Sequence, residues 1–260
     1  MIRFHSVSKR YGDAGTYALQ DVSFEVQTGE LVALVGGSGS GKTTTLKCIN
    51  RLIEPDTGDV FLDGNPVRTE PGPALRRHIG YVFQGIGLFP HMSVSENIGI
   101  TPQLLGWERT RIQARVEELL DLVDLPREFA TRAPSALSGG QRQRVGVARA
   151  LAAEPKLVLM DEPFGALDPV TRDTLGRAYR KLHEHMHLTT VLVTHDMLEA
   201  LLLADRIIVM QSGRVLANGS PQQLLQSDTN PAVRELLDMP RKQAERLSSL
   251  FPPPEQDKDA

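Results

Sequence analysis

A glycine-rich segment early in the chain has the residue types and spacing of a loop that binds phosphate groups. Residues 36–43 read GGSGSGKT and fit the pattern G-x-x-x-x-G-K-[ST]. The glycines let successive backbone N–H groups converge on one anion, because no Cβ stands in the way. Lys42 would contact the β- and γ-phosphates of a nucleoside triphosphate, and the Thr43 hydroxyl would ligate Mg²⁺. The predicted nucleotide-binding residues here are Gly36, Gly37, Ser38, Gly39, Ser40, Gly41, Lys42, Thr43 and Thr44.

Two neighbouring carboxylates form a second candidate site. Asp161 and Glu162 directly follow the apolar run at 157–160, so we expect them at the C-terminal end of a buried strand. Asp161 would hold Mg²⁺ through water, and Glu162 would orient and polarise an attacking water. Two acids placed there without a metal would repel each other, which disfavours a structural role. A solvated strand end is the alternative.

Hydrophobic patterning predicts the elements that must position these residues. Residues 1 to about 30 alternate apolar and polar positions, as half-buried antiparallel strands do. Buried-strand patterns recur at 31–35, 157–160, 190–194 and 206–210, separated by helical segments, which predicts a parallel sheet. The glycine loop thus lies between a buried strand and a helix, which is the context that the phosphate motif requires. A flexible glycine turn is the alternative.

The middle of the chain has helical patterning instead. Apolar residues recur at helical spacing within 107–123, and 138–153 is a second helix candidate. A hairpin is expected at 60–64 and a short strand at 79–84. We therefore predict an α/β fold, with a phosphate-loop NTPase (RecA-like) core, an N-terminal antiparallel β subdomain and a helical subdomain inserted at about 86–155.

Composition narrows the possible partners and compartments. The formal net charge of −3 gives no attraction to nucleic acid, so no nucleic-acid partner is expected. Cys48 is the single cysteine, which excludes an intrachain disulfide and fits a reducing compartment. No apolar run approaches the roughly 20 residues needed to cross a bilayer. Any role in transport is therefore expected at the cytosolic face of a partner.

Further motifs resemble the ATP-binding subunits of ATP-binding-cassette (ABC) transporters. Residues 137–141 (LSGGQ) look like the signature motif of this family. Gln84, residues 166–168 (ALD) and residues 194–196 (THD) resemble its Q-, D- and H-loops. The motifs occur in the family's order over about residues 2–222. By this resemblance, an ABC ATPase domain spans 1–240, followed at 241–260 by a C-terminal tail that is expected to be partly disordered.

The resemblance assigns roles in ATP and Mg²⁺ chemistry. Tyr11 matches the aromatic residue that stacks on adenine, although the nearby Tyr17 can be confused with it. The implied catalytic residues are Glu162, His195, Gln84 and Lys42. The implied metal ligands are Thr43, Gln84 and Asp161. The signature residues expected to bind ATP are Ser138, Gly139, Gly140 and Gln141.

Partners follow from the same resemblance. Ser138 and the N–H groups after it would open a helix and form a second anion site. In the family, two copies meet head to tail, and the signature of one closes on the ATP of the other. The implied partners are a second copy of this subunit, transmembrane permease subunits and, indirectly, a solute-binding protein. The implied location is peripheral, on the cytoplasmic face of the inner membrane.

Two local segments favour a particular cargo. Residues 85–94 (GIGLFPHMSV) and 161–173 (DEPFGALDPVTRD) resemble importers of glycine betaine, choline or carnitine. Many such subunits carry a pair of CBS domains after the cassette, and residues 223–260 are too few for that pair. The alternatives are an importer of another small solute, such as a polyamine or sulfonate, and a soluble ABC ATPase. Soluble members usually carry two cassettes or a long coiled-coil insertion, and neither is seen.

Other polar residues are expected to have structural roles. His183, His185 and His187 would point to different sides of a helix, so metal binding is not expected. Cys48 is predicted to be a core residue. Arg142 and Arg144 are interpreted as solvated or interface charges.

Overall fold

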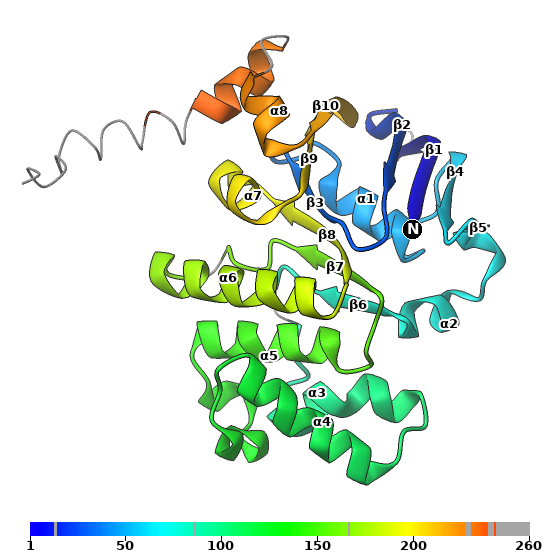
Figure 1. Cartoon of the computed structure of the whole chain (residues 1–260). Helices are drawn as coiled ribbons and strands as arrows, with labels where there is room; N and C mark the ends of the chain where they lie inside the picture. Colours follow the sequence, from blue (N-terminus) through cyan, green and yellow to red (C-terminus); the bar gives the residue numbers. More distant parts are fainter. Residues whose placement is uncertain (13–14, 86, 166, 227–229, 239–241, 243–260) are drawn as a thin grey trace, which may run out of the picture.

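The structure is a computed structural model that describes residues 1–12, 15–85, 87–165, 167–226, 230–238 and 242 (Figure 1). The predicted tail at 241–260 therefore lies outside the described residues, apart from Lys242. Ile86 and Ala166, which belong to two of the motif segments, also lie outside them.

A six-stranded sheet forms the centre of the molecule. Its strands are, in spatial order, β10 (Arg214–Gly219), β9 (Arg206–Gln211), β3 (Leu31–Val35), β8 (Thr189–Thr194), β7 (Leu157–Asp161) and β6 (Ile79–Val82). All neighbouring pairs are parallel except β10 with β9. Every residue of β3, β7 and β8 is buried, because both faces of the sheet are covered.

A second, antiparallel sheet is built mainly from the N-terminal residues. Its strands are, in spatial order, β2 (Tyr17–Val26), β1 (Ile2–Arg10), β4 (Thr57–Leu62) and β5 (Asn65–Pro66). Helix α1 (Lys42–Ile49) contacts β2 and β4 on one side and β7 and β8 on the other, so it lies between the two sheets. The apolar residues that alternate along β1 and β2 face a hydrophobic core that they share with α1. In this core the rings of Phe4 and Phe24 stack with their centroids 4.5 Å apart. The predicted N-terminal antiparallel subdomain is confirmed.

Helices cover the other face of the large sheet. α6 (Pro169–His185) and α7 (Met197–Leu203) contribute Leu175, Leu182 and Ala200 to a core shared with alternate residues of β3. Short helices elsewhere among the described residues include η1 (Val67–Thr69), α2 (Gly72–Arg77) and α8 (Pro221–Gln226). No helix among the described residues is long and apolar enough to cross a membrane.

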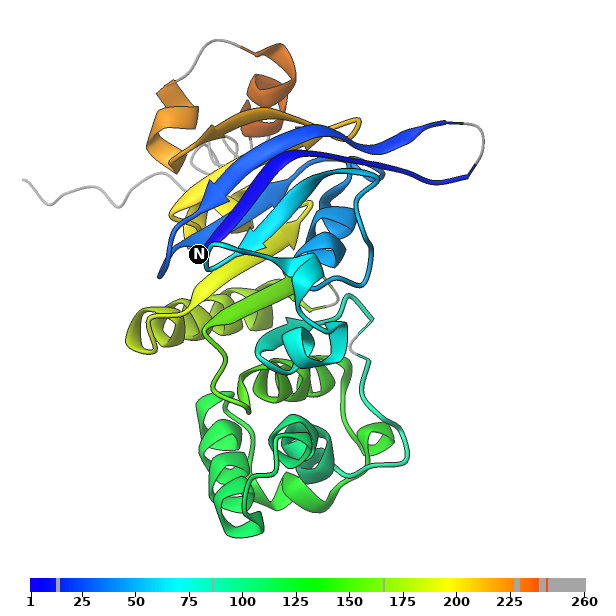
Figure 2. The same cartoon turned by 90° about the vertical axis from the view of Figure 1, so that its right-hand side faces the viewer.

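The segment between β6 and β7 is helical, as Figures 1 and 2 show at the end of the molecule away from the antiparallel sheet. Its helices are α3 (Val94–Leu104), α4 (Arg109–Leu122), η2 (Arg127–Thr131), η3 (Pro134–Ala136) and α5 (Gly139–Leu151). α3 packs on both α4 and α5, and α5 also contacts β6. α5 therefore joins the helical segment to the sheet. The overall fold class matches the prediction, and the boundaries 86–155 stay a prediction.

Three local expectations need correction. β6 ends at Val82, so Gln84 lies in the turn that follows and not in the strand. α4 begins at Arg109 and not at Trp107, because Gly106 has a positive φ of 77° and Glu108 occupies the N-cap. α3 lies within the predicted helical subdomain but was not predicted as an individual helix, although Ser93 and Glu96 form a capping box at its start.

Gly80 provides a test of the contact between β6 and α5. A Cβ at this position would lie 2.4 Å from the backbone oxygen of Ala150 in α5. The Gly80→Ala variant is therefore expected to lose about 1–3 kcal/mol of unfolding free energy, measured by urea denaturation. Gly85→Ala is the matched control, because a Cβ there would meet nothing within 4 Å. Equal stability of the two variants would contradict this packing.

Candidate functional site

The glycine loop connects β3 to α1, and its backbone packs closely against other segments. A Cβ on Gly36 would lie 2.1 Å from the backbone oxygen of Met210, and one on Gly41 would lie 2.4 Å from that of Ala18. Gly41 is also the N-cap of α1, with a left-handed φ of 104° and no side chain to cap the helix. The first N–H groups of α1 thus have no side-chain cap, which suits an anion at this end.

Lys42 lies over this loop. Its ammonium donates to the backbone oxygens of Gly36 at 2.7 Å and Gly37 at 2.9 Å. Burial lowers the pKa of Lys42, while the nearby carboxylates of Glu162 and Asp161 act in the opposite direction. A phosphate group beside this ammonium would further favour its charged form. The loop and its lysine therefore fit a phosphate ligand.

Asp161 lies at the carboxyl end of β7 and faces α1. The Thr43 hydroxyl donates to Asp161 Oδ1 at 3.0 Å, so two hard oxygen donors from distant segments meet here. Burial raises the pKa of Asp161, Glu162 raises it further, and the Thr43 hydrogen bond lowers it. A divalent cation would stabilise the buried carboxylate, so this donor set fits Mg²⁺.

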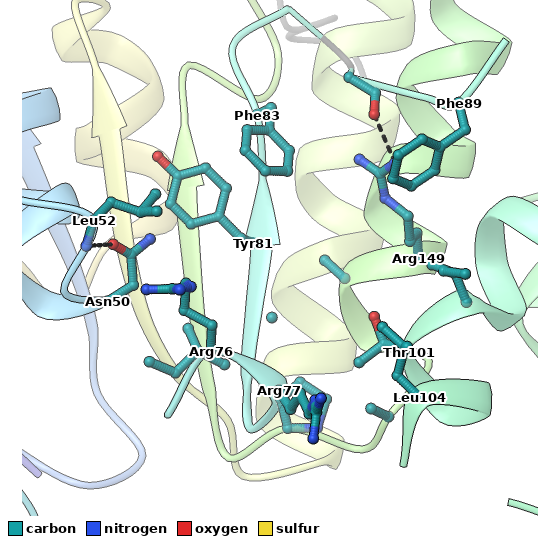
Figure 3. Close-up of a pocket in the computed structure, with 17 residues that line it drawn as sticks. Asn50, Leu52, Arg76, Arg77, Tyr81, Phe83, Phe89, Thr101, Leu104 and Arg149 are labelled. Atoms are coloured by element: carbon teal, nitrogen blue, oxygen red, sulfur yellow. Dashed lines mark hydrogen bonds between the residues drawn. The ribbon is translucent and has the colours of Figure 1, made fainter. Parts of the chain in front are cut away.

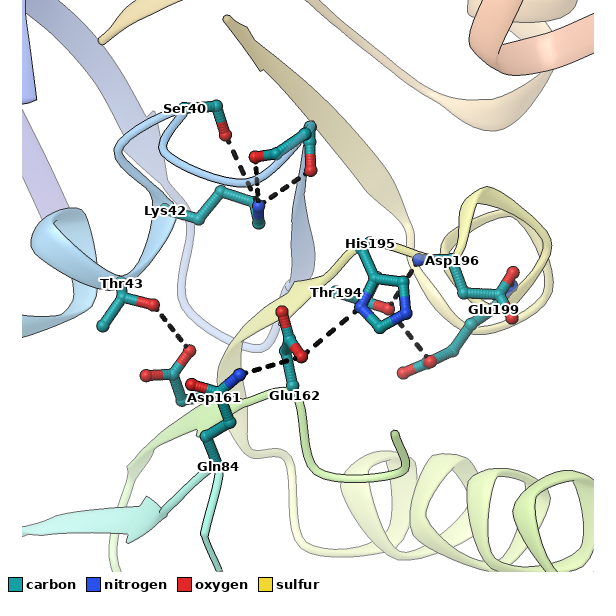
Figure 4. A network of polar contacts seen from close by, with 12 residues as sticks. Ser40, Lys42, Thr43, Gln84, Asp161, Glu162, Thr194, His195, Asp196 and Glu199 are labelled. Carbon is teal, nitrogen blue, oxygen red and sulfur yellow. Dashed lines mark hydrogen bonds and ion pairs between the residues drawn. The ribbon is translucent and has the colours of Figure 1, made fainter. Parts of the chain in front are cut away.

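Glu162 is the point where three loops converge (Figure 4). Its Oε2 accepts a hydrogen bond from Gln84 Nε2 at 3.1 Å and lies 3.4 Å from His195 Nδ1. Its backbone N–H donates to the oxygen of Val193 at 2.9 Å, with a left-handed φ of 48° at Glu162. This conformation is uncommon for a side chain larger than glycine, and such strain is concentrated at functional sites. Gln84, Glu162 and His195 thus form one polar cluster next to Asp161.

Both candidate aromatic residues lie beside the phosphate loop. Tyr11 and Tyr17 line the same cavity of about 360 Å³, together with residues 39–44. The Tyr17 hydroxyl is bonded to Arg10, whose guanidinium also lies 4.0 Å from the centre of the Tyr17 ring. Tyr11 is 52% exposed, so its ring is accessible for stacking. The assignment of the base to Tyr11 stays a prediction.

The signature residues lie at the start of α5. Ser138 is the N-cap: its hydroxyl accepts from the Gln141 N–H at 3.2 Å, and its own N–H donates to Gln141 Oε1 at 2.9 Å. Gly139 and Gly140 occupy the first turn. In the part of the chain that the structure describes, no hydrogen bond or ion pair joins this helix start to the phosphate loop.

Comparison with known proteins identifies the family. The family model described as "ABC transporter" matches residues 19–165, more than half of the chain. This chain belongs to the ABC transporter family. The cassette is 48% identical over 241 residues to the choline transport ATP-binding protein OpuBA of Bacillus subtilis (strain 168), covering 93% of this chain and 63% of that protein. It is 49% identical over 235 residues to the glycine betaine uptake system ATP-binding protein YehX of Escherichia coli (strain K12), covering 90% and 76%.

A solved structure agrees with this assignment. The cassette superposes with a TM-score of 0.77 on the dimeric post-hydrolysis state of the ATP-binding cassette MJ0796 bound to ADP and Pi. The two are 34% identical, and the match covers 85% of this chain and 99% of the other. An ABC cassette fold is thereby confirmed. The chain spans less than two thirds of the length of the choline relative.

The structure also shows the surroundings of the residues for which no role in the site was predicted. Cys48 is fully buried in the core of the cassette, and burial raises the pKa of its thiol to about 12. His183 is buried, with Nδ1 3.0 Å from Thr190 Oγ1. Arg142 donates to the Leu137 oxygen, and Arg144 pairs with Asp124. These contacts are internal to one chain.

Glu199 is a buried polar residue of the cassette that the motif analysis missed. It is 9% exposed on α7, and its Oε2 accepts from the Thr194 hydroxyl at 3.0 Å, one residue before His195. The sequence signal was available, because Glu199 is the single charged residue of the apolar helix MLEALLL. Burial raises the pKa of Glu199 to about 7, the Thr194 hydrogen bond opposes this, and Asp196 adds to it.

This pKa predicts how stability depends on pH. Between about pH 4.5 and 7 Glu199 ionises more readily in the unfolded chain than in the folded one, so its contribution to stability falls as pH rises. Glu199→Gln removes this titration. Relative to the variant, wild type is expected to lose about 3 kcal/mol of unfolding free energy between pH 4.5 and pH 8. Urea denaturation at several pH values measures the difference, and a difference independent of pH would contradict the burial of this carboxyl.

Proposed function

We propose that this chain is the ATP-binding and ATP-hydrolysing subunit of an ABC importer that takes up a small solute, an osmoprotectant quaternary amine. The observation that carries the proposal is the convergence of Lys42, Asp161, Glu162 and His195 at the carboxyl ends of parallel strands. Ligands of open α/β sheets bind at this edge. The relatives' roles in choline and glycine betaine uptake support the importer assignment.

Each residue of the site has a role in ATP hydrolysis. The backbone of residues 36–44 and the Lys42 ammonium bind the phosphates, and Tyr11 stacks on the adenine. Thr43, Gln84 and Asp161 would hold Mg²⁺, which would supply positive charge to the phosphate oxygens. Glu162 accepts a proton from the attacking water and orients it, and His195 donates a hydrogen bond to a γ-phosphate oxygen.

Two copies are proposed to act as a head-to-tail dimer. Each chain has two helix starts suited to anions, one at the phosphate loop and one at Ser138. Across a dimer, residues 138–141 of one copy would close on the ATP of the other. Closure excludes water and completes the catalytic set. The dimeric state of the structural neighbour supports this arrangement.

A groove next to the Q-loop is proposed to receive the permease. It has a volume of about 550 Å³ between α2, β6 and α3, with half-exposed apolar side chains on its rim (Figure 3). Those side chains are Leu52, Phe83, Phe89 and Leu104. The groove begins one residue from Gln84, so a permease helix seated there would sense the state of the nucleotide site. We propose that the subunit therefore acts peripherally on the cytoplasmic face of the inner membrane, with a solute-binding protein as an indirect partner.

Two measurements test the proposal, one of ATP hydrolysis and one of solute uptake. The purified chain is mixed with ATP and Mg²⁺, and phosphate release is measured; hydrolysis that requires Mg²⁺ is expected. Cells that lack this chain are then tested for uptake of radiolabelled glycine betaine or choline, which is expected to fall. Normal uptake of both, with loss of polyamine or sulfonate uptake, would support the alternative importer. Purification of the tagged chain from cell membranes is expected to recover a membrane subunit with it. Failure to recover one, with uptake of all the tested solutes unchanged in cells that lack the chain, would support a soluble ABC ATPase.

A further inference from the structure

A chain of polar contacts lies beneath the loop that carries His195. It consists of two side chains on α6 and α7, Arg172 and Glu199, and of the residues on either side of the histidine, Thr194 and Asp196. Figure 4 shows Glu199, Thr194 and Asp196 around His195. Glu199 lies outside all the motif segments used above, and Arg172 lies within the segment 161–173 but has been given no role there. Both line a cavity of about 500 Å³ between α6 and α7.

Glu199 holds the residue before the histidine. Its Oε2 accepts from Thr194 Oγ1 at 3.0 Å, and the same Thr194 oxygen accepts the Asp196 N–H at 3.0 Å. These two bonds span the His195 backbone. The other carboxyl oxygen of Glu199 is buried and has no hydrogen-bond partner within the described residues. A polar group placed this way costs stability, which indicates that it is retained for another reason.

Arg172 holds the residue after the histidine. Its Nη1 donates to Asp196 Oδ2 at 3.2 Å, and its Nη2 donates to the backbone oxygen of Leu167 at 3.2 Å. Leu167 immediately precedes Asp168, which caps α6 by accepting the Thr171 N–H at 3.0 Å. Asp196 Oδ1 in turn caps α7 by accepting from the N–H groups of Leu198 and Glu199. One guanidinium therefore joins the turn before α6 to the histidine loop.

The histidine needs such support. Its side chain is 62% exposed, and among the described residues it has one polar contact, the 3.4 Å approach of Nδ1 to Glu162. An exposed ring with one long contact is not held in place by its own surroundings. The orientation of the His195 side chain therefore depends on the backbone at 194–196. The hydrogen bonds of Glu199 to Thr194 and of Arg172 to Asp196 hold this backbone on both sides of the histidine.

We infer that Glu199 and Arg172 are positioning residues for His195, and that Arg172 couples the turn at Leu167 and Asp168 to the histidine loop. The inference rests on the proposed ATP hydrolysis. Among the described residues, neither side chain has a hydrogen bond or ion pair to residues 36–44, so their loss should change the rate of the chemical step and leave nucleotide binding unchanged. A helix-packing role would instead affect the stability of the whole chain.

The first test removes the acceptor on α7. Glu199→Leu is expected to lower kcat about tenfold or more with KM for ATP within about twofold, whereas Glu199→Gln keeps an acceptor for Thr194 and stays near wild type. Thr194→Val, which removes the matching hydroxyl, should reproduce the loss and serves if Glu199→Leu does not fold. In a His195→Ala background Glu199→Leu should have little further effect, because the group it positions is gone. An equal loss in both backgrounds would overturn the inference.

The second test addresses the link to α6. Arg172→Met is expected to lower kcat with unchanged nucleotide affinity, and Arg172→Lys, which can keep one of the two contacts, should restore part of the rate. Arg177→Met is the control, because Arg177 is exposed on the same helix and pairs with Asp173. If wild type hydrolyses ATP and Arg172→Met behaves like Arg177→Met, the positioning role of Arg172 is refuted and the proposed function still stands. If wild type does not hydrolyse ATP, the proposed function fails and this inference fails with it.

Discussion

The Glu162→Gln variant is expected to bind ATP as wild type does and to hydrolyse it at least about a hundredfold more slowly. The physical reason is the position of this carboxylate, which accepts a hydrogen bond from the Gln84 amide and lies next to Asp161 at the end of β7. Glutamine has nearly the same shape and can still accept a hydrogen bond, but it cannot take a proton from water. The substitution therefore removes the general base and leaves the phosphate loop intact.

A second consequence of Glu162→Gln is a trapped dimer. If ATP holds two copies together and hydrolysis releases them, the variant should elute as a dimer in ATP and as a monomer without nucleotide. Size-exclusion chromatography with light scattering measures this, alongside phosphate release. Glu154→Gln is the control, because Glu154 is an exposed surface carboxylate paired with Arg111. Wild-type hydrolysis by Glu162→Gln would refute the assignment of the base.

Lys42→Ala is expected to act one step earlier, on the nucleotide itself. The Lys42 ammonium is the cation that the loop holds at its centre, through the backbone oxygens of Gly36 and Gly37. Its loss removes the charged hydrogen-bond donor of the loop, so ATP affinity should fall at least about tenfold, and turnover with it.

Calorimetry or a fluorescent nucleotide measures the affinity of Lys42→Ala, and phosphate release measures its turnover. Lys181→Ala, on the exposed side of α6, is the control for removal of one positive charge. Wild-type affinity and wild-type turnover together in Lys42→Ala would contradict the phosphate-loop interpretation. The two variants also distinguish the steps, because Glu162→Gln should spare binding and Lys42→Ala should not.

The parts of the fold predicted from sequence are those determined by local patterns. β3, β7 and β8 are continuously buried, so their apolar runs identified them. α3 was missed because Gly99 and Pro102 interrupt a helix whose apolar pattern is weak. Its capping box was readable in the sequence as Ser93 and Glu96.

The site shows the same division between local and tertiary information. Spacing alone predicted Lys42, Asp161 and Glu162, because each follows a recognisable strand. The sequence did not predict that Glu162 would meet both Gln84 and His195, since these residues are 78 and 33 positions away and meet through strand order. Glu199 was missed for a related reason: its partner, the Thr194 hydroxyl, becomes apparent once β8 and α7 are packed.

The position of β3 in the sheet determines how late in synthesis this strand can pair with its neighbours. Its two neighbours are β8 and β9, whose residues leave the ribosome at least about 150 positions after β3, which takes roughly 8–30 s at about 5–20 residues per second. Until β8 and β9 have been synthesised, the five apolar residues of β3 cannot be buried in the sheet. They stay exposed in the nascent chain, where chaperones can bind them. Gly36 likewise waits for Met210, against which it packs. Nucleotide can therefore stabilise the nearly finished chain but cannot guide its early folding.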